Sequence, residues 1–223
     1  METHTFHHVE PSQSQAHVVL VQDVQNAQAV LEDVKRGGEK FGEMPMALID
    51  AKMICSSSHL LVSIHQAILR NARKIDGKTT GLRTKSIHSE VLWNLSITNN
   101  IAETFRIFGL SDTTKDLLLI HIAHSPEQGG PRAKDVLQKM QSIVEGDITQ
   151  EGLSVLDSWQ GDESEQRMID WDAICKAYKL GDMTVSHNDI DDSTIDQVDV
   201  EQTIRKRIDS IVTSLVAMKF VAS

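Results

Sequence analysis

The stretch from Lys85 to Leu110 constrains the fold more than any other part of the chain, because it predicts two short helices joined by a polar elbow. The first helix is expected over Ser86–Leu95, where apolar residues recur at helical spacing. Residues 96–100 then interrupt this pattern with serine, threonine and asparagine, whose short side chains compete for backbone hydrogen bonds. The pattern indicates a compact structural unit and carries no catalytic chemistry.

The second helix of this unit has clear start and stop signals. Asn100 is a favourable N-cap, and Glu103 three residues later completes a pair similar to a capping box. Gly109 is expected to end the helix in a left-handed conformation. The apolar residues that we expect this helix to bury are Ile101, Phe105 and Phe108.

The same stretch carries a resemblance to a known family. Its sequence contains, in order, His-Ser-Glu, Asn-Leu-Ser, Asn-Asn-Ile and Phe-Gly-Leu. This order resembles the signature of the PRPK-binding-protein (TPRKB) family, whose members are small, non-catalytic subunits of the KEOPS (EKC) complex. The resemblance extends upstream through Met46–Ile54 and His59–Leu69 and downstream to Leu117–Ile120, and so covers about two thirds of the chain.

The resemblance implies a function in tRNA modification through partner proteins. It implies binding to the N-terminal lobe of a small PRPK-type kinase and, through it, to the other KEOPS subunits. It also implies help in docking the 3′ CCA end of tRNA, so that the complex can make threonylcarbamoyladenosine beside the anticodon. Cytoplasm and nucleus are the expected locations. A link to telomere maintenance or transcription could come only from the family, because nothing in these residues indicates it.

The last helix is the expected kinase contact. Apolar residues recur at steps of three or four from Val200 to Met218, which predicts a sustained amphipathic face. Burial in the domain core and contact with a partner both explain such a face, and the family resemblance favours the partner. The first helix or the helix at Ile101–Phe108 is expected to assist. The residues that we assign to kinase binding are Ile204, Ile208, Ile211, Leu215 and Phe220.

Charge is unevenly distributed. The chain has a formal net charge of −10, but residues 145–200 alone carry about −12, so the rest is slightly basic. Basic residues gather between Arg70 and Lys85, either as a solvated helix end or as a site that binds phosphates electrostatically. The residues that we assign to tRNA binding are Arg73, Lys74, Lys78, Arg83 and Lys85.

Length and patterning indicate a single α/β (α+β) domain. At 223 residues, we expect one domain over 17–223 with a small mixed or antiparallel sheet packed against several helices. Residues 1–16 are expected to form a disordered tail, and residues 147–166 a flexible acidic surface insertion. The predicted strands are His17–Gln22, Met46–Asp50 and Leu117–Ile122, the last covered on both faces. Additional helices are expected over about 23–36, 59–72, 131–145 and 170–180.

Several residue types could suggest catalysis or metal binding, and each has a simpler explanation. Serines 56–58 precede His59 and His65, but helix starts favour serine for capping alone. His121 and His124 are expected at an edge or surface, and the cysteines at 55 and 175 as small buried apolar residues. We expect no metal, no cofactor and no membrane span, and a soluble intracellular protein. The alternatives are a stand-alone small enzyme using histidine and serine, or a diverged paralogue without kinase binding.

Overall fold

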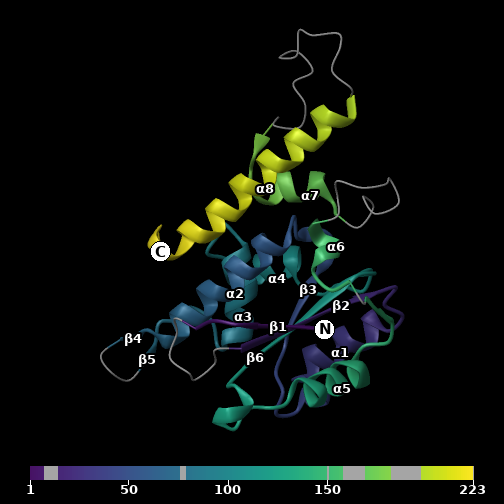
Figure 1. Cartoon of the computed structure of the whole chain (residues 1–223), viewed down its shortest axis with the longest axis vertical. Coiled ribbons are helices and arrows are strands. Elements are labelled where there is room, and N and C mark those ends of the chain that lie inside the picture. Colours follow the sequence, from purple (N-terminus) through teal and green to yellow (C-terminus); the bar gives the residue numbers. More distant parts are fainter. Residues whose placement is uncertain (8–14, 76–78, 150, 158–168, 182–196, 223) are drawn as a thin grey trace.

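The computed structural model describes residues 1–7, 15–75, 79–149, 151–157, 169–181 and 197–222. In this part of the chain an antiparallel sheet lies between two layers of helices (Figure 1). The strands are β1 Glu2–Thr5, β2 Gln15–Gln22, β3 Ala47–Asp50, β4 Lys74–Ile75, β5 Thr79–Thr80, β6 Leu117–Ala123 and β7 Asp147–Ile148. The α-helices are α1 Ala27–Arg36, α2 Ser57–Ala72, α3 Ile87–Leu95, α4 Ile101–Phe108, α5 Ala133–Ile143, α6 Ser154–Asp157, α7 Trp171–Ala177 and α8 Gln197–Ala222. Short 3-10 turns are η1 Glu39–Phe41, η2 Ala51–Met53 and η3 Pro126–Gln128.

The main sheet has the order β1-β2-β6-β3, and β7 also pairs with β2. All of its pairings are antiparallel, with Val18 opposite Ile120 in the long β2–β6 ladder and Ala47 opposite Ile120 on the other side. Every residue of β6 is buried, which confirms the prediction of a central strand covered on both faces. The predicted fold class, an α/β domain with a small sheet packed against several helices, is confirmed as well.

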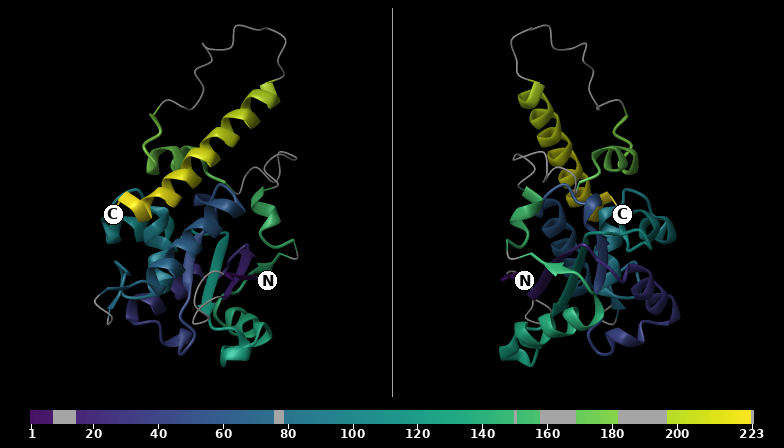
Figure 2. Two further views of the ribbon diagram at one scale, coloured as in Figure 1. Left: turned by 60° about the vertical axis from the view of Figure 1, so that its left-hand side comes forward. Right: turned by 90° about the vertical axis from the view of Figure 1, so that its right-hand side faces the viewer.

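The two faces of the sheet bury alternate residues of the same strands. Val18 and Leu20 of β2 belong to the cluster that includes α2, α3 and α8. Val19 and Val21 belong to the opposite cluster, which contains residues of α1 and α5. Figures 1 and 2 show these helix layers on either side of the sheet. The alternation follows from the period of two in a strand, and it gives the domain a core on each face of the sheet.

The predicted pair of helices is confirmed as α3 and α4. Ser86 and Ser89 form a capping box at the start of α3, and the Asn100 side chain accepts the Glu103 N–H at the start of α4. The left-handed stop at Gly109 is wrong, because this residue is extended, with φ −82° and ψ 172°. The extended conformation allows Gly109 to form a bridge with Ile49 at the edge of β3. A tertiary contact therefore determines how the helix ends.

The prediction of a disordered N-terminal tail is wrong for residues 2–5, which form β1. Glu2 pairs opposite Val18 and Thr5 opposite Gln15, so β1 covers one edge of β2. The edge of β2 offers unpaired backbone groups, and an added strand satisfies them despite its polar side chains. Residues 8–14 lie outside the described part of the chain.

The predicted surface insertion at 147–166 is partly structured. Its start forms β7 and α6, and Leu153 and Leu156 are buried. The Glu2 carboxylate accepts the backbone N–H of Leu153 at 2.7 Å, which ties α6 to the N-terminal strand. The acidic residues at 158–166, and those at 182–196, lie outside the described residues.

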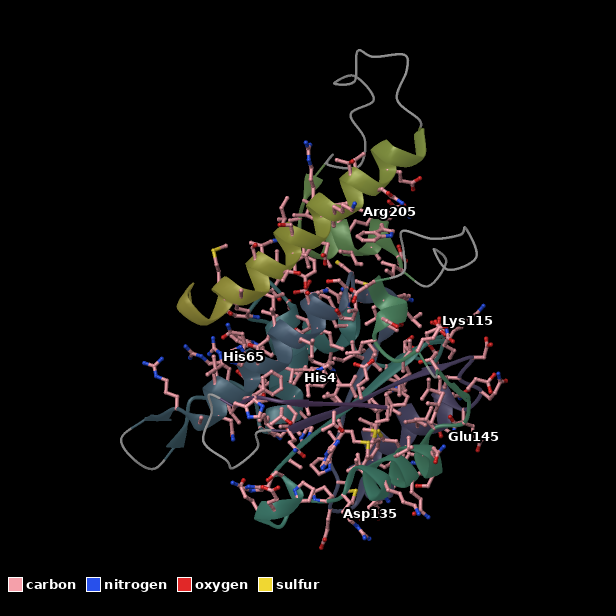
Figure 3. All side chains as sticks on the ribbon, viewed as in Figure 1. His4, His65, Lys115, Asp135, Glu145 and Arg205 are labelled. Carbon is pink, nitrogen blue, oxygen red and sulfur yellow. The ribbon has the colours of Figure 1, made fainter. Side chains whose placement is uncertain are left out.

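Helix α8 packs against α2, and its N-terminal end extends past α7, whose Ile174 and Cys175 are buried in the core (Figures 1 and 2). Arg205 of α8, labelled in Figure 3, contacts Trp171 of α7. Its guanidinium carbon lies 5.7 Å from the centre of the Trp171 ring, and it pairs with Glu201 one turn earlier in α8. Among the described helices, none is long and apolar enough to cross a membrane.

Candidate protein and nucleic-acid interfaces

The predicted kinase-binding residues differ in burial, because they lie on different faces of α8. Ile208 is 2% exposed and packs in the core beside Val212 and Val216, so it is not available at the surface. Ile204, Ile211 and Leu215 are half-buried along one flank of the same helix. The side chain of Phe220 lies outside the described part of the structure.

Met218, which the sequence analysis did not assign to binding, continues this half-exposed flank. It is 56% exposed and is one of the most exposed large apolar side chains in the described chain. At 100° per residue, Met218 lies about 20° from Ile211 around the helix axis. We call Ile204, Ile211, Leu215 and Met218 the α8 flank. Its apolar surface has the spacing typical of a helix that meets a partner.

Lys219 fixes the C-terminal end of α8 to the elbow between α3 and α4. Its ammonium group donates to the carbonyl oxygens of Trp93, Ser96 and Thr98, at 2.5, 2.5 and 3.0 Å. It also lies 3.5 Å from the centre of the Trp93 ring, a favourable position for a cation. Burial lowers the pKa of Lys219 to about 7, and the nearby Arg70 lowers it as well. The contacts place the exposed end of the α8 flank beside the elbow.

The predicted tRNA-binding cluster is also divided by the structure. Arg73, Arg83 and Lys85 are exposed, on the segments that connect α2 to α3. The side chain of Lys74 and the whole of Lys78 lie outside the described residues. Arg70, which the sequence places in the same basic run, is only 4% exposed and pairs with buried Glu90.

Glu90 holds the connection that carries the exposed arginine and lysine. Its Oε2 accepts the backbone N–H groups of Arg83 and Thr84 at 3.0 and 2.9 Å, and the Thr84 hydroxyl at 2.8 Å. Since its side chain is 0% exposed, these hydrogen bonds stand in for water at Oε2, while Oε1 lies 3.8 Å from Nε of Arg70. The cations at Arg83 and Lys85 are therefore presented from a segment fixed to the core, and the sequence pattern contains no signal for this.

The histidines and serines that could suggest an enzyme form structural contacts. His59 accepts the Cys55 N–H with Nδ1 and pairs with the Tyr178 hydroxyl through Nε2, and burial lowers its pKa to about 3. Ser56 caps α2 and donates to the Asp209 carboxylate at 2.6 Å. A serine nucleophile needs a base within hydrogen-bond reach, and here these groups are already bound to other partners.

His121 is buried, and the prediction of an edge or surface position for it is wrong. It lies on the central strand β6, and its Nδ1 donates to the Pro45 carbonyl at 2.8 Å. Its ring stacks between those of His17 and His88, with centroid distances of 6.4 and 5.5 Å. Parallel rings do not direct their nitrogen atoms to one point. No group of three metal-ligating side chains occurs among the residues that the structure describes.

The exposed surfaces define a class of protein: an α/β domain with apolar and basic patches suited to macromolecular partners. Comparison with known proteins gives its family. The family model described as "Kinase binding protein CGI-121" matches residues 21–220, and this chain belongs to that family. The predicted resemblance to a kinase-binding KEOPS subunit is thereby confirmed.

Three fungal relatives illustrate the similarity, and each is named as an EKC/KEOPS complex subunit CGI121. The protein of Coccidioides immitis is 27% identical, over 98% of this chain and 97% of its own length. The protein of Aspergillus fumigatus is 32% identical, over 77% of this chain and 79% of its own length. That of Aspergillus terreus is 34% identical, over 80% of each chain.

Proposed function

We propose that this chain is a non-catalytic subunit of a KEOPS/EKC complex that binds its PRPK-type kinase and helps to dock tRNA for threonylcarbamoyladenosine synthesis. Family membership supports the kinase and the complex as partners. The α8 flank is the observation that carries the proposal for the kinase, because its apolar side chains stay partly exposed beside the buried face of Ile208, Val212 and Val216.

The proposed kinase contact predicts a specific loss of binding. Replacing Ile211 and Met218 together by glutamate should reduce co-purification of the kinase at least about tenfold, because each carboxylate would be desolvated at an apolar interface. The measurement is a pull-down with the organism's PRPK-type kinase, read out by the amount of kinase retained. A thermal melt of each variant checks that the fold is intact.

The matched control for this experiment places the same charges elsewhere on the same helix. Ser210 and Ser214 are exposed, and the Ser210→Glu and Ser214→Glu pair should retain the kinase. Equal retention by both double variants would show that the α8 flank does not bind the kinase. A folded wild-type protein that fails to retain the kinase would instead favour a diverged paralogue without kinase binding.

We also propose that Arg73, Arg83 and Lys85, together with Lys74 and Lys78, contact tRNA phosphates. Replacing the three exposed, described cations by glutamate should weaken tRNA binding. The negative slope of log affinity against log salt should become shallower by about 2, because fewer counterions are released. Filter binding of tRNA to the assembled complex at several salt concentrations measures both effects.

The control for the tRNA experiment changes net charge equally at a distance from this cluster. Lys115, Arg132 and Lys134 are exposed outside the connection between α2 and α3, and Figure 3 labels Lys115. Their replacement by glutamate should leave the salt slope within error of wild type. The same slope for both triple variants would refute a phosphate contact at the cluster.

A further inference from the structure

A groove of about 720 Å³ lies between α1–η1 on one side and α3–α4 on the other. Its volume is in the range of sites that enclose a small ligand or a few side chains of a peptide. The apolar residues that line it include Leu31, Val34, Phe41, Met46, Leu92 and Phe105. None of its lining residues comes from α8 or from the connection at 73–85, so it is a surface separate from the two discussed above.

Two apolar side chains at this groove are exposed to solvent instead of being buried in the core. Val34 of α1 is 43% exposed and Phe105 of α4 is 40% exposed, from the two helices on opposite sides. The sequence predicts that Phe105 and Ile101 are buried, and that prediction is wrong, since Ile101 is 42% exposed as well. α4 buries Phe108 against Tyr178 instead. Helix α4 thus carries more apolar residues than it buries in the domain core.

The charges at the groove favour an acidic occupant. Lys35 of α1 and Arg106 of α4 line it from opposite sides and are both exposed. Asp112 is the one carboxylate among its lining residues, so the lining is net positive on a chain of net charge −10. Two cations can meet a single carboxylate, whereas a nucleic-acid backbone gains its affinity from many phosphate contacts, which this groove does not provide.

His88 lines the groove as a neutral, buried ring. Its Nε2 accepts the backbone N–H of Ile122 at 3.0 Å, so the proton of the neutral ring is on Nδ1. Burial lowers the pKa of His88 to about 3, which keeps the ring neutral. Nδ1 is buried and has no hydrogen-bond partner among the described residues. Because this atom is shielded from solvent, His88 contributes ring surface to the groove wall and no accessible donor.

We propose that this groove binds an extended segment of a partner protein in which an apolar residue adjoins an acidic one. The apolar side chain enters between Val34 and Phe105, and the carboxylate meets Lys35 and Arg106. This docking site is additional to the kinase and tRNA contacts proposed above and does not depend on them.

Two labelled peptides test the proposal: acetyl-Gly-Leu-Glu-Leu-Gly-amide and the same peptide with lysine in place of glutamate. Fluorescence anisotropy should show at least about tenfold tighter binding of the acidic peptide to the full chain, because only this peptide pairs its charge with the two cations. Phe105→Ser should weaken its binding about tenfold through loss of the aromatic contact. The Lys35→Glu and Arg106→Glu double variant should reverse the preference, so that the lysine peptide binds tighter.

The control for the reversal is the Arg132→Glu and Lys134→Glu double variant, which changes net charge equally on exposed residues near and in α5. It should keep the preference for the acidic peptide. Equal binding of the two peptides, failure of the acidic peptide to bind, or its displacement by a cytidine-cytidine-adenosine trinucleotide would overturn the proposal. So would loss of kinase co-purification in the Phe105→Ser variant, since the groove would then belong to the kinase interface.

Discussion

Lowering the pH from 7 to 5 should cost this protein about 4 kcal/mol of unfolding free energy through two buried histidines, His59 and His88. Each has a pKa of about 3 in the folded chain, because burial disfavours the charged ring. In the unfolded chain the pKa returns to about 6.5. Below pH 6.5 the unfolded state therefore binds protons that the folded state does not, and stability falls as the pH drops toward 3.

Urea unfolding of the wild type and of single variants at pH 7 and pH 5 separates these histidines from other groups. His88→Gln keeps an acceptor for the Ile122 N–H but removes the titrating ring, and should reduce the pH-dependent loss by about 2 kcal/mol. Asp50, Asp116 and Asp209 have raised pKa values through burial and act in the opposite direction. They are present in every variant, so their effect cancels in the difference.

The contrary result is that His88→Gln and His59→Gln each lose as much stability between pH 7 and pH 5 as the wild type. Folding would then not lower the pKa of either histidine. His124 provides the control, because it is exposed and outside the stacked rings. His124→Gln should keep the full pH dependence of the wild type.

Replacing Glu90 by alanine should lower the unfolding free energy by about 3–5 kcal/mol, the range found when one partner of a buried ion pair is removed. The side chains of Arg70 and Glu90 are 5% and 0% exposed, with Nε and Oε1 3.8 Å apart. The substitution would leave the Arg70 charge buried without this carboxylate. It would also remove the acceptor of the Arg83 and Thr84 backbone N–H groups.

Urea unfolding at pH 7 measures this loss, and Glu32 supplies a matched control. Glu32 is exposed and pairs with Arg36 one turn later in α1, so Glu32→Ala should cost less than about 1 kcal/mol. Glu90→Gln, which keeps the side-chain shape and an acceptor, should lose less than Glu90→Ala. Similar losses for Glu32→Ala and Glu90→Ala would mean that the buried carboxylate has no special role.

Local sequence determines the elements of this protein to a large extent. Capping residues and apolar spacing predict α3, the elbow and α4, since caps act within a few residues of the helix end. The near-continuous apolar run at 117–122 predicts a strand covered on both faces, and β6 has this position. The sequence also carries the family relationship, because several short motifs match in order.

Tertiary structure decides which side of each element is available. Ile208 and Ile211 have the same helical pattern in the sequence, but packing on α2 buries the first and leaves the second half-exposed. Arg70 lies in a basic run, but pairing with Glu90 removes it from the surface. Periodicity defines the direction of an apolar face, whereas its exposure depends on residues far away in the chain that pack against it. The α8 flank, the groove and the buried histidine stack all depend on such long-range packing.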